Sequence, residues 1–232
     1  MNADHPLDNP VWHALTGPQA WAAEGTGEAR RYHPDVSVFA AVADSQPNSW
    51  TDLFELVGVG GYAVLFRHDA PTAPEGWRVV TRMDGFQMVL EGEPRPQGDP
   101  PTIVALGISD VPAMAELVER TNPGPFTVRT IELGSYFGVF DDGRLVAMAG
   151  ERMRLPGYTE ISAVCTDAAA RGRGLGGHLT AHVARHIAAS DSVPFLHVVA
   201  DNPARTVYES LGFTIRQVNK VTIAKAVGET GG

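Results

Sequence analysis

A glycine-rich stretch between an apolar run and a helix-like segment constrains the fold of this chain more than any other feature. Residues 171–177 read R-G-R-G-L-G-G, the apolar run before them covers residues 161–166, and the helix-like segment after them covers residues 178–189. Each glycine inside such an element costs roughly 0.5–1 kcal/mol of backbone entropy relative to alanine. The first amides of a helix are unpaired and lie at the positive end of its dipole. We therefore predict a strand–loop–helix unit that binds a phosphate group.

The bulk composition is that of an ordinary globular protein of 232 residues, with 44% hydrophobic and 19% charged residues. A formal net charge of −9 argues against nucleic-acid or anionic-membrane partners, because those require a basic surface. The single cysteine, Cys165, excludes an intrachain disulfide and a Cys-rich zinc site. No apolar stretch resembles a signal peptide or a membrane span, so a cytoplasmic protein is expected.

A proline- and glycine-rich segment divides the chain. Residues 91–101 read E-G-E-P-R-P-Q-G-D-P-P, and proline fixes φ and removes a backbone donor, so this segment cannot be a helix interior or a central strand. We interpret residues 92–101 as a linker between an N-terminal α/β region, residues 1–91, and a C-terminal domain, residues 102–232.

Local patterns predict the elements of both parts. In the N-terminal region we expect helices over residues 11–23 and 49–57 and strands over 36–43, 61–67 and 77–90, the last interrupted by a turn at Asp84-Gly85. In the C-terminal domain the expected strands cover residues 102–106, 136–140, 144–154, 159–166, 195–199 and 213–226. One expected helix there begins at Ser109 or Asp110. Three others cover residues 126–133, 178–189 and 203–211. This order predicts a mixed α/β or α+β sheet and not a regular Rossmann alternation.

Three glycine motifs compete for the phosphate-binding loop. A P-loop requires Lys followed by Ser or Thr after its last glycine, but His178 and Leu179 follow Gly177. The dinucleotide fingerprint G-x-G-x-x-G is formally present, and Asp201 would be its ribose-binding acid. However, residues 167–171 separate the strand from Gly172, the first glycine of the fingerprint. Too little chain also follows residue 200 to complete a doubly wound sheet. The third motif is Arg-x-x-Gly-x-Gly, formed by Arg171, Gly174 and Gly176.

The third motif and its surroundings resemble the GCN5-related N-acetyltransferases. The sequence Y-E-S-L-G-F at residues 208–213 is similar to the C-terminal signature of that family, and the order of elements from Thr102 onward also fits it. The resemblance covers about 130 residues and is strongest to the FR47-like branch, akin to glycine N-acyltransferases. It implies a mixed, mostly antiparallel acetyltransferase-type sheet flanked by helices. In that branch the N-terminal region can be a degenerate acetyltransferase-like half, which would suit residues 1–91.

The resemblance also implies roles for individual residues. Backbone groups of Val164, Cys165 and Thr166 would pair with the pantetheine arm of an acyl-CoA, as an added strand does. The pyrophosphate would lie on the loop, with charge added by one of its arginines; the loop residues concerned are Arg171, Gly172, Arg173, Gly174, Leu175, Gly176 and Gly177. Tyr208 lies where the family places the acid that protonates the leaving thiolate. Asn202, or Asp201 beside it, would contact the cofactor.

The base that deprotonates the attacking amine has three candidates. Glu160 matches a position where some family members carry a catalytic glutamate, and partial burial would raise its pKa. His197 on the next strand has an ordinary pKa near 6.5 and competes for the role, as does an ordered water. His178, His182 and His186 form a helical stripe, but no H-E-x-x-H glutamate accompanies them, so no metal is expected. A buried strand cysteine is the expected state of Cys165, and not an acylated nucleophile.

The expected function is transfer of an acetyl or other short acyl group from acyl-CoA to a primary amine. The amine would belong to a small molecule or a peptide and would attack the thioester directly. A catalytically silent acyl-CoA-binding module is the alternative, and a Rossmann dinucleotide-binding protein is a more distant one. The identity of the acceptor, the acyl chain length and the oligomeric state, for which a homodimer is one option, stay open because fold analogy does not define a substrate.

Overall fold

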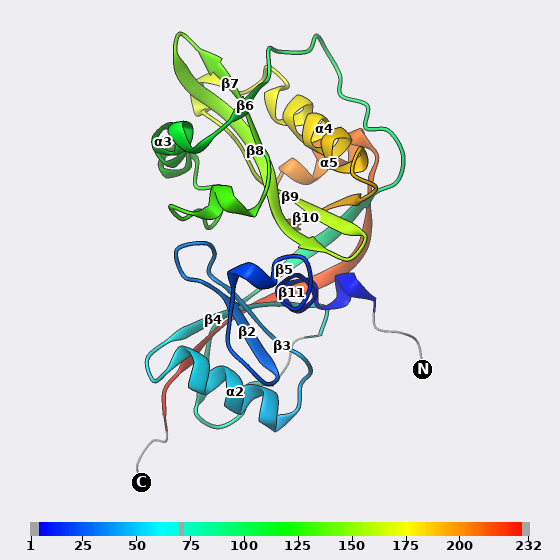
Figure 1. Cartoon of the computed structure of the whole chain (residues 1–232). Helices are drawn as coiled ribbons and strands as arrows, with labels where there is room; N and C mark the ends of the chain where they lie inside the picture. Colours follow the sequence, from blue (N-terminus) through cyan, green and yellow to red (C-terminus); the bar gives the residue numbers. More distant parts are fainter. Residues whose placement is uncertain (1–4, 70–71, 229–232) are drawn as a thin grey trace.

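Eleven strands form one continuous sheet in the computed structural model, which describes residues 5–69 and 72–228 (Figure 1). The strand order is β1-β2-β3-β4-β11-β5-β10-β9-β8-β7-β6, and two of the ten neighbouring pairs are parallel, β3 with β4 and β9 with β10. Helices cover both of its faces. The predicted mixed, mostly antiparallel sheet flanked by helices is therefore confirmed.

The N-terminal residues form the part of the sheet that ends at β1. Its strands are β1 (Ala23–Glu24), β2 (Ala29–Tyr32), β3 (Phe39–Val42) and β4 (Tyr62–Arg67), and its helices are α1 (Pro10–Leu15) and α2 (Pro47–Val57). The expected helix over residues 11–23 is shorter than predicted, because after α1 the chain turns at Thr16 and forms only the 3-10 turn η2 (Ala20–Ala22). Trp50 of α2 packs edge-on against Trp77, with ring centroids 5.4 Å apart.

The strand β5 (Trp77–Leu90) connects the two predicted parts. It lies between β10 (Val193–Val199) and β11 (Phe213–Ala226), so a strand from the N-terminal region pairs on both sides with strands of the C-terminal domain. The predicted turn at Asp84-Gly85 is wrong. Asp84 pairs with Lys220 and Gly85 with Asn219 in a continuous ladder, and this long-range pairing overrides the local Asp-Gly turn propensity.

The remaining elements follow the predicted order. They are β6 (Val104–Leu106), the 3-10 turn η3 (Ile108–Asp110), α3 (Val111–Thr121), η4 (Thr130–Leu133), β7 (Tyr136–Asp141), β8 (Arg144–Leu155), β9 (Tyr158–Thr166), η5 (Ala168–Ala170), α4 (Leu175–Ala188) and α5 (Ala204–Leu211). Asp142 and Gly143 have φ values of 47° and 77°, as a tight β7–β8 hairpin requires. The helix expected over residues 126–133 is reduced to the single 3-10 turn η4.

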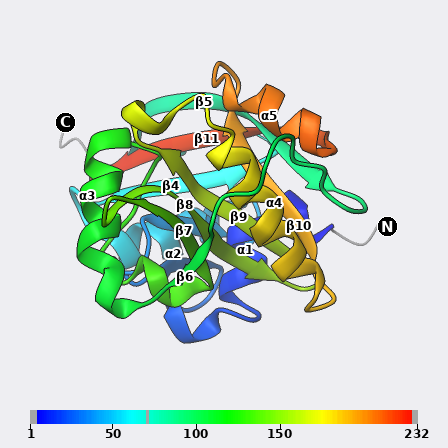
Figure 2. The same ribbon diagram turned by 90° about the horizontal axis from the view of Figure 1, so that it is seen from above.

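Two layers of side chains cover the sheet. On one face, Leu179 of α4 and Leu211 of α5 belong to a core with Ile161 and Leu196 of the sheet. On the other face, α3 packs over β8 and β9, and α1 packs against β8 and β3. Figure 2 shows α3 and α4 on opposite sides of β8. No described helix is long and apolar enough to cross a membrane.

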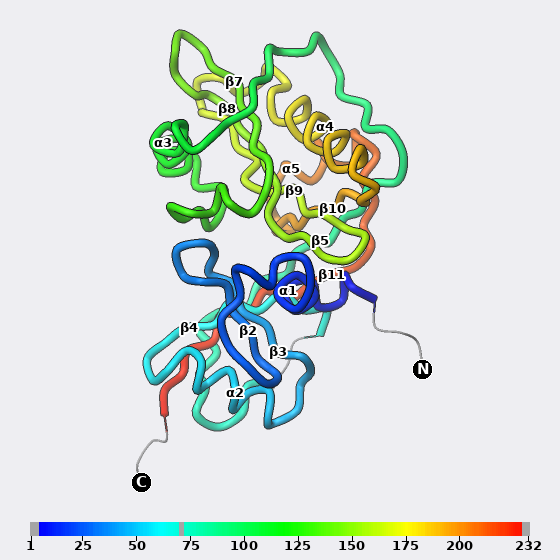
Figure 3. The backbone as a smooth tube through the Cα atoms, in the orientation of Figure 1, coloured from blue at the N-terminus to red at the C-terminus, as the bar shows by residue number. Residues whose placement is uncertain are grey.

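The proline-rich segment has no helix or strand between β5 and β6. It passes along the outer side of α4 (Figure 3), where Arg185 donates from Nη2 to the carbonyl oxygen of Pro94 at 2.9 Å. The division of the chain at residues 92–101 stays a prediction, since the sheet itself runs without a break through strands from both sides of it.

Candidate active site

The parallel strands β9 and β10 diverge at their carboxyl ends. Their pairing begins at Tyr158 with Val193 and ends at Ile161 with Leu196. Residues 162–166 of β9 and 197–199 of β10 continue as strands but no longer pair with each other. This leaves a wedge in the sheet whose backbone polar groups are available to an extended guest that carries amides.

A bulge in β9 lies at the start of this wedge. The β8–β9 register shifts between the pairs Gly150–Ser162 and Met148–Cys165, and Ala163 has a φ of 52°. A non-glycine residue in the left-handed region costs about 1–3 kcal/mol and is kept where surrounding structure enforces it. The bulge changes the direction of the amides that follow it. No local sequence pattern predicts this bulge, because alanine is not a residue that favours the left-handed conformation.

The glycine loop follows directly after β9 and η5. Gly172 and Gly174 have φ values of 81° and 72°, which disfavour any residue with a side chain. Helix α4 begins at Leu175, and its first intrahelical bond runs from the His178 amide to the Gly174 carbonyl oxygen at 3.1 Å. The amides of residues 175–177 therefore lack intrahelical partners and form the positive end of a 14-residue helix.

Gly176 and Gly177 differ from the other two glycines of the loop. Neither has a positive φ, and a Cβ added to them would approach no protein atom closer than 3.7 Å at Gly176 and 3.6 Å at Gly177. The chain itself therefore does not require glycine at either position. Both glycines leave the backbone at the first turn of α4 uncovered by a side chain.

The charged and polar residues near the loop divide into paired and unpaired groups. Arg173 binds Asp141 at 2.6 Å, and both side chains are about half exposed. Arg171 is exposed and has no partner within residues 5–69 and 72–228. Asn202 accepts a hydrogen bond at 2.9 Å from the amide of Ala204, the first residue of α5. Arg173 is therefore paired, whereas the Arg171 side chain makes no hydrogen bond or ion pair with the described residues, and the Asn202 side chain is bound to the start of its own helix.

Tyr208 lies on α5 in the core that joins α4 to the sheet. It is 8% exposed, and its hydroxyl makes no hydrogen bond in the described part of the chain. Burial, with a smaller contribution from Cys165, raises the pKa of Tyr208 to about 12. Burial also raises the pKa of the Cys165 thiol to about 11, so this side chain is a poor nucleophile at neutral pH.

The raised pKa expected for Glu160 is wrong. Its carboxylate is fully buried and accepts two hydrogen bonds from Arg152, Nε to Oε2 at 2.7 Å and Nη2 to Oε1 at 2.6 Å. Burial alone would raise the pKa, but the Arg152 charge and its hydrogen bonds, with a further bond from His197, lower it to about 2. The residue is therefore a permanent anion at neutral pH and a weak base.

His197 is enclosed by partners on both ring nitrogens. Nδ1 lies 2.7 Å from Oε1 of Glu160, while Nε2 lies 3.1 Å from Nε2 of Gln87 and 3.0 Å from Nδ2 of Asn219. The Gln87 oxygen accepts from Arg216 and the Asn219 oxygen from Gln217, so both amide NH2 groups point at the ring. These contacts place Nδ1 against the Glu160 carboxylate and Nε2 against two side-chain amides. No free lone pair is left for an acceptor amine.

Two histidines of α4, His182 and His186, pack edge-on against the same Phe137 ring. His186 also lies 3.0 Å from the Ser135 hydroxyl. Burial is the main cause that lowers the pKa of His182. Within residues 5–69 and 72–228, no group of three or more His, Cys, Asp or Glu side chains is arranged to hold a metal ion.

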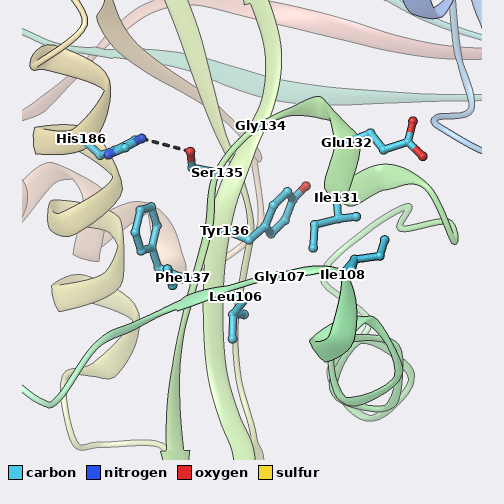
Figure 4. Close-up of a pocket in the computed structure, with 11 residues that line it drawn as sticks. Leu106, Gly107, Ile108, Ile131, Glu132, Gly134, Ser135, Tyr136, Phe137 and His186 are labelled. Carbon is cyan, nitrogen blue, oxygen red and sulfur yellow. Dashed lines mark hydrogen bonds between the residues drawn. The ribbon is translucent and has the colours of Figure 1, made fainter.

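Among the described residues, two cavities adjoin the C-terminal strands. A groove of about 540 Å³ is lined by residues of β6, β7, η4 and the C-terminal half of α4, including Tyr136 and His186 (Figure 4). His186 is three turns along α4 from the glycine loop, so this groove is remote from the predicted phosphate site. A second cavity of about 10 Å³ adjoins the bulge and is lined by Arg152, Ser162, Ala163 and residues 123–126. The smaller cavity is the one beside the wedge.

Comparison with known proteins identifies the family. The family model described as FR47-like protein matches residues 136–222. A protein of Novosphingobium aromaticivorans, described as an acetyltransferase of the GNAT family, is 42% identical over 96% of this chain and 99% of its own, with a TM-score of 0.88. A GCN5-related N-acetyltransferase of Kribbella flavida shares the fold at 18% identity, with a TM-score of 0.65 over 96% of this chain and 95% of that one. No curated protein matches. The chain belongs to the GNAT family of GCN5-related N-acetyltransferases, which confirms the resemblance.

Proposed function

We propose that the protein transfers an acetyl or other short acyl group from acyl-CoA to a primary amine. The observation that carries the proposal is the junction of three features at one end of the sheet: the diverging strands, the bulge at Ala163 and the uncapped first turn of α4. Pantetheine is an extended chain with two amides, and it leads from a thioester to a pyrophosphate. The wedge and the helix terminus offer partners for both parts in the same order.

We propose a role for each residue of the site. Backbone groups of Val164, Cys165 and Thr166 hold the pantetheine arm and stabilise the oxyanion of the tetrahedral intermediate. Amides from Gly172 to Gly177, including those of Arg173, Gly174, Leu175 and Gly176, hold the pyrophosphate, and Arg171 adds charge. The unpartnered phenol of Tyr208 protonates the leaving thiolate, since with a pKa of about 12 it is fully protonated at neutral pH. Asn202 orients the start of α5 beside this site.

Proton loss from the attacking amine needs a different account from the one based on Glu160. With a pKa of about 2 and its lone pairs occupied, Glu160 does not accept that proton efficiently. We propose that Glu160 is a positioning residue for Arg152 and His197. The acceptor attacks as the fraction that is already neutral. Water in the wedge takes the proton that the nitrogen loses once the C–N bond has formed, and the C–S bond then breaks to release the thiolate.

A catalytically silent acyl-CoA-binding module is the second candidate, and Tyr208→Phe separates the two. A thiol-release assay with acetyl-CoA and a panel of amines should show turnover for the natural sequence and a loss of about 100-fold or more in kcat for the variant. Acetyl-CoA affinity should be unchanged, because the hydroxyl has no partner that the substitution removes. Equal turnover of both proteins would refute the role of Tyr208, and no turnover with any amine would favour the silent module.

We propose that the division at residues 92–101 separates an N-terminal region that supports the site from a C-terminal domain that holds acyl-CoA. A single buried cysteine suits a reducing, cytoplasmic compartment, and a net charge of −9 does not suit nucleic-acid or membrane partners.

A further inference from the structure

The segment that connects α3 to η4 lies against the bulge of β9. Its residues 123–126 line the same small cavity as Ser162 and Ala163, and both Phe126 and Ala163 pack against the core beneath α3. Helix α4, which begins at the glycine loop, covers the opposite face of the sheet (Figure 2). A molecule that approaches the wedge from the face away from α4 therefore passes residues 123–126.

Three hydrogen bonds form a clamp that ties this connecting segment to the N-terminal region. Thr127 donates from Oγ1 to the carbonyl oxygen of Asp35, and the Arg129 amide donates to the same oxygen at 3.0 Å. Thr130 donates from Oγ1 to the carbonyl oxygen of Val36 at 2.9 Å. The two acceptors lie on the loop between β2 and β3, 92 residues before Thr127 and 94 before Thr130. A loop of the N-terminal region thus fixes the backbone of a segment beside the wedge.

The Thr130 hydroxyl is the centre of this clamp. The residue is 4% exposed, and its Oγ1 both donates to Val36 and accepts from the Thr127 amide at 2.7 Å. One hydroxyl therefore closes the turn that follows residue 126 and joins it to the N-terminal region. Valine has nearly the same shape but can do neither, whereas serine can do both. A threonine does not ionise near neutral pH, so Thr130 can affect turnover only through the position of its neighbours.

A buried glutamine of the N-terminal region holds the other end of η4. Gln19 is 2% exposed and donates from Nε2 to the carbonyl oxygens of Leu133, at 3.3 Å, and Arg152, at 2.7 Å. Tyr32 of β2 donates to Oε1 of the same glutamine at 2.6 Å, so the amide is itself held in place. The connection between α3 and β7 therefore takes its position from the N-terminal region.

We propose that the N-terminal region positions the acceptor side of the active site through Gln19, Asp35 and Val36, and that Thr130 is the positioning residue that carries this effect. The inference rests on the proposed function, because it assumes that acyl-CoA lies in the wedge with its pyrophosphate at the glycine loop. The acceptor amine then reaches the thioester from the face of α3, along residues 123–126. Displacing that wall by about 1 Å weakens productive binding of the acceptor, while the glycine loop still binds acyl-CoA.

Kinetics on a conservative pair of variants test the inference. Thiol release from acetyl-CoA is measured over a range of concentrations of the amine that reacts fastest with the natural protein. Thr130→Val should raise KM for that amine about tenfold, with kcat within about threefold of the natural value. The Kd for acetyl-CoA, measured by titration calorimetry, should be unchanged. Thr130→Ser keeps the hydroxyl and should restore KM to within about twofold of the natural value.

Thr159→Val is the matched control. Thr159 is 5% exposed and its Oγ1 lies 2.9 Å from the Ser192 hydroxyl, so this variant also removes a hydrogen-bonded hydroxyl from a buried threonine. The residue lies near the start of β9, where that strand is still paired with β10. The control should lower the thermal midpoint of unfolding and leave KM for the amine unchanged. Thr127→Val, at a half-buried residue of the clamp, is a second variant that should raise KM.

The outcomes separate this inference from the function on which it rests. An unchanged KM for the amine in Thr130→Val overturns the positioning role and leaves the acetyltransferase proposal intact. An equal rise of KM in Thr159→Val, or a Kd for acetyl-CoA that rises together with KM, also overturns it, because a general loss of structure is then the cause. If Thr130→Val does not fold, Thr127→Val decides by the same comparison. Absence of thiol release with every amine refutes the proposed function and this inference with it.

Discussion

Replacing Glu160 by Gln tests whether this residue supports the structure or performs the chemistry. The side chain is fully buried and forms a two-bond pair with Arg152. Lowering its pKa from 4.5 to about 2 corresponds to about 3 kcal/mol of stability at neutral pH. Glutamine keeps the shape but leaves Arg152 without its counter-charge, so we expect a loss of about 3–5 kcal/mol in the free energy of unfolding.

The sign of the pH dependence follows from the lowered pKa. A carboxyl group whose pKa is depressed in the folded state stabilises the protein above its unfolded pKa, and this contribution is lost as the pH falls through the folded value. The natural protein should therefore lose stability between about pH 4.5 and about pH 2. Glu160→Gln should lack that part of the dependence. Glu132→Gln, which breaks an exposed pair with Arg129, is the control and should cost less than about 1 kcal/mol.

Urea denaturation at several pH values and thiol-release kinetics on the folded variant complete the test. Turnover should remain within about tenfold of the natural protein, because a residue that only positions its neighbours does not move the proton. A drop of about 100-fold or more in kcat, together with unchanged stability, would show that Glu160 acts as the base and would refute the assignment made from its ion pair.

Further predictions concern the loop and the pH profile. Gly176→Ala should leave stability unchanged or slightly higher, since its Cβ meets no atom closer than 3.7 Å. The same variant should raise the Kd for acetyl-CoA about tenfold or more. Gly174→Ala, at a φ of 72°, should instead destabilise the fold by about 1–2 kcal/mol. Thermal unfolding measures the effect on stability and titration calorimetry the effect on affinity. An acetyl-CoA affinity of Gly176→Ala equal to that of the natural protein would contradict pyrophosphate binding at the glycine loop. The profile of kcat/KM should rise with the fraction of neutral acceptor amine and show no descending limb below about pH 11, because Tyr208 has a pKa of about 12. A limb near pH 7 would indicate a different acid.

Local sequence patterns predicted most elements of the C-terminal domain, and long-range pairing decided the features they missed. The β7–β8 hairpin follows from Asp-Gly turn chemistry, and α4 follows from the glycine loop. The Asp84-Gly85 turn failed because β5 is paired on both sides there, which no local window reveals. The place of β5 between β10 and β11 is likewise a property of the whole sheet.

The charge state of Glu160 depends on the register of the β8–β9 pair. The turn at Pro156-Gly157 would bring Glu160 opposite Met153 in a regular hairpin, but the β8–β9 register shifts between Glu151 and Arg154. The shift places Arg152 beside Glu160 and converts an expected base into half of an ion pair. The loop residues carry a readable signature because several glycines close together cost backbone entropy. A register shift formed by ordinary residues carries none.

Titration calorimetry with acetyl-CoA and with NAD, in parallel on the natural protein, tests whether the glycine loop and the diverging strands β9 and β10 together hold acyl-CoA. Saturable binding of acetyl-CoA at one site per chain, with no binding of NAD, is the predicted result. Saturable binding of NAD without binding of acetyl-CoA would contradict it.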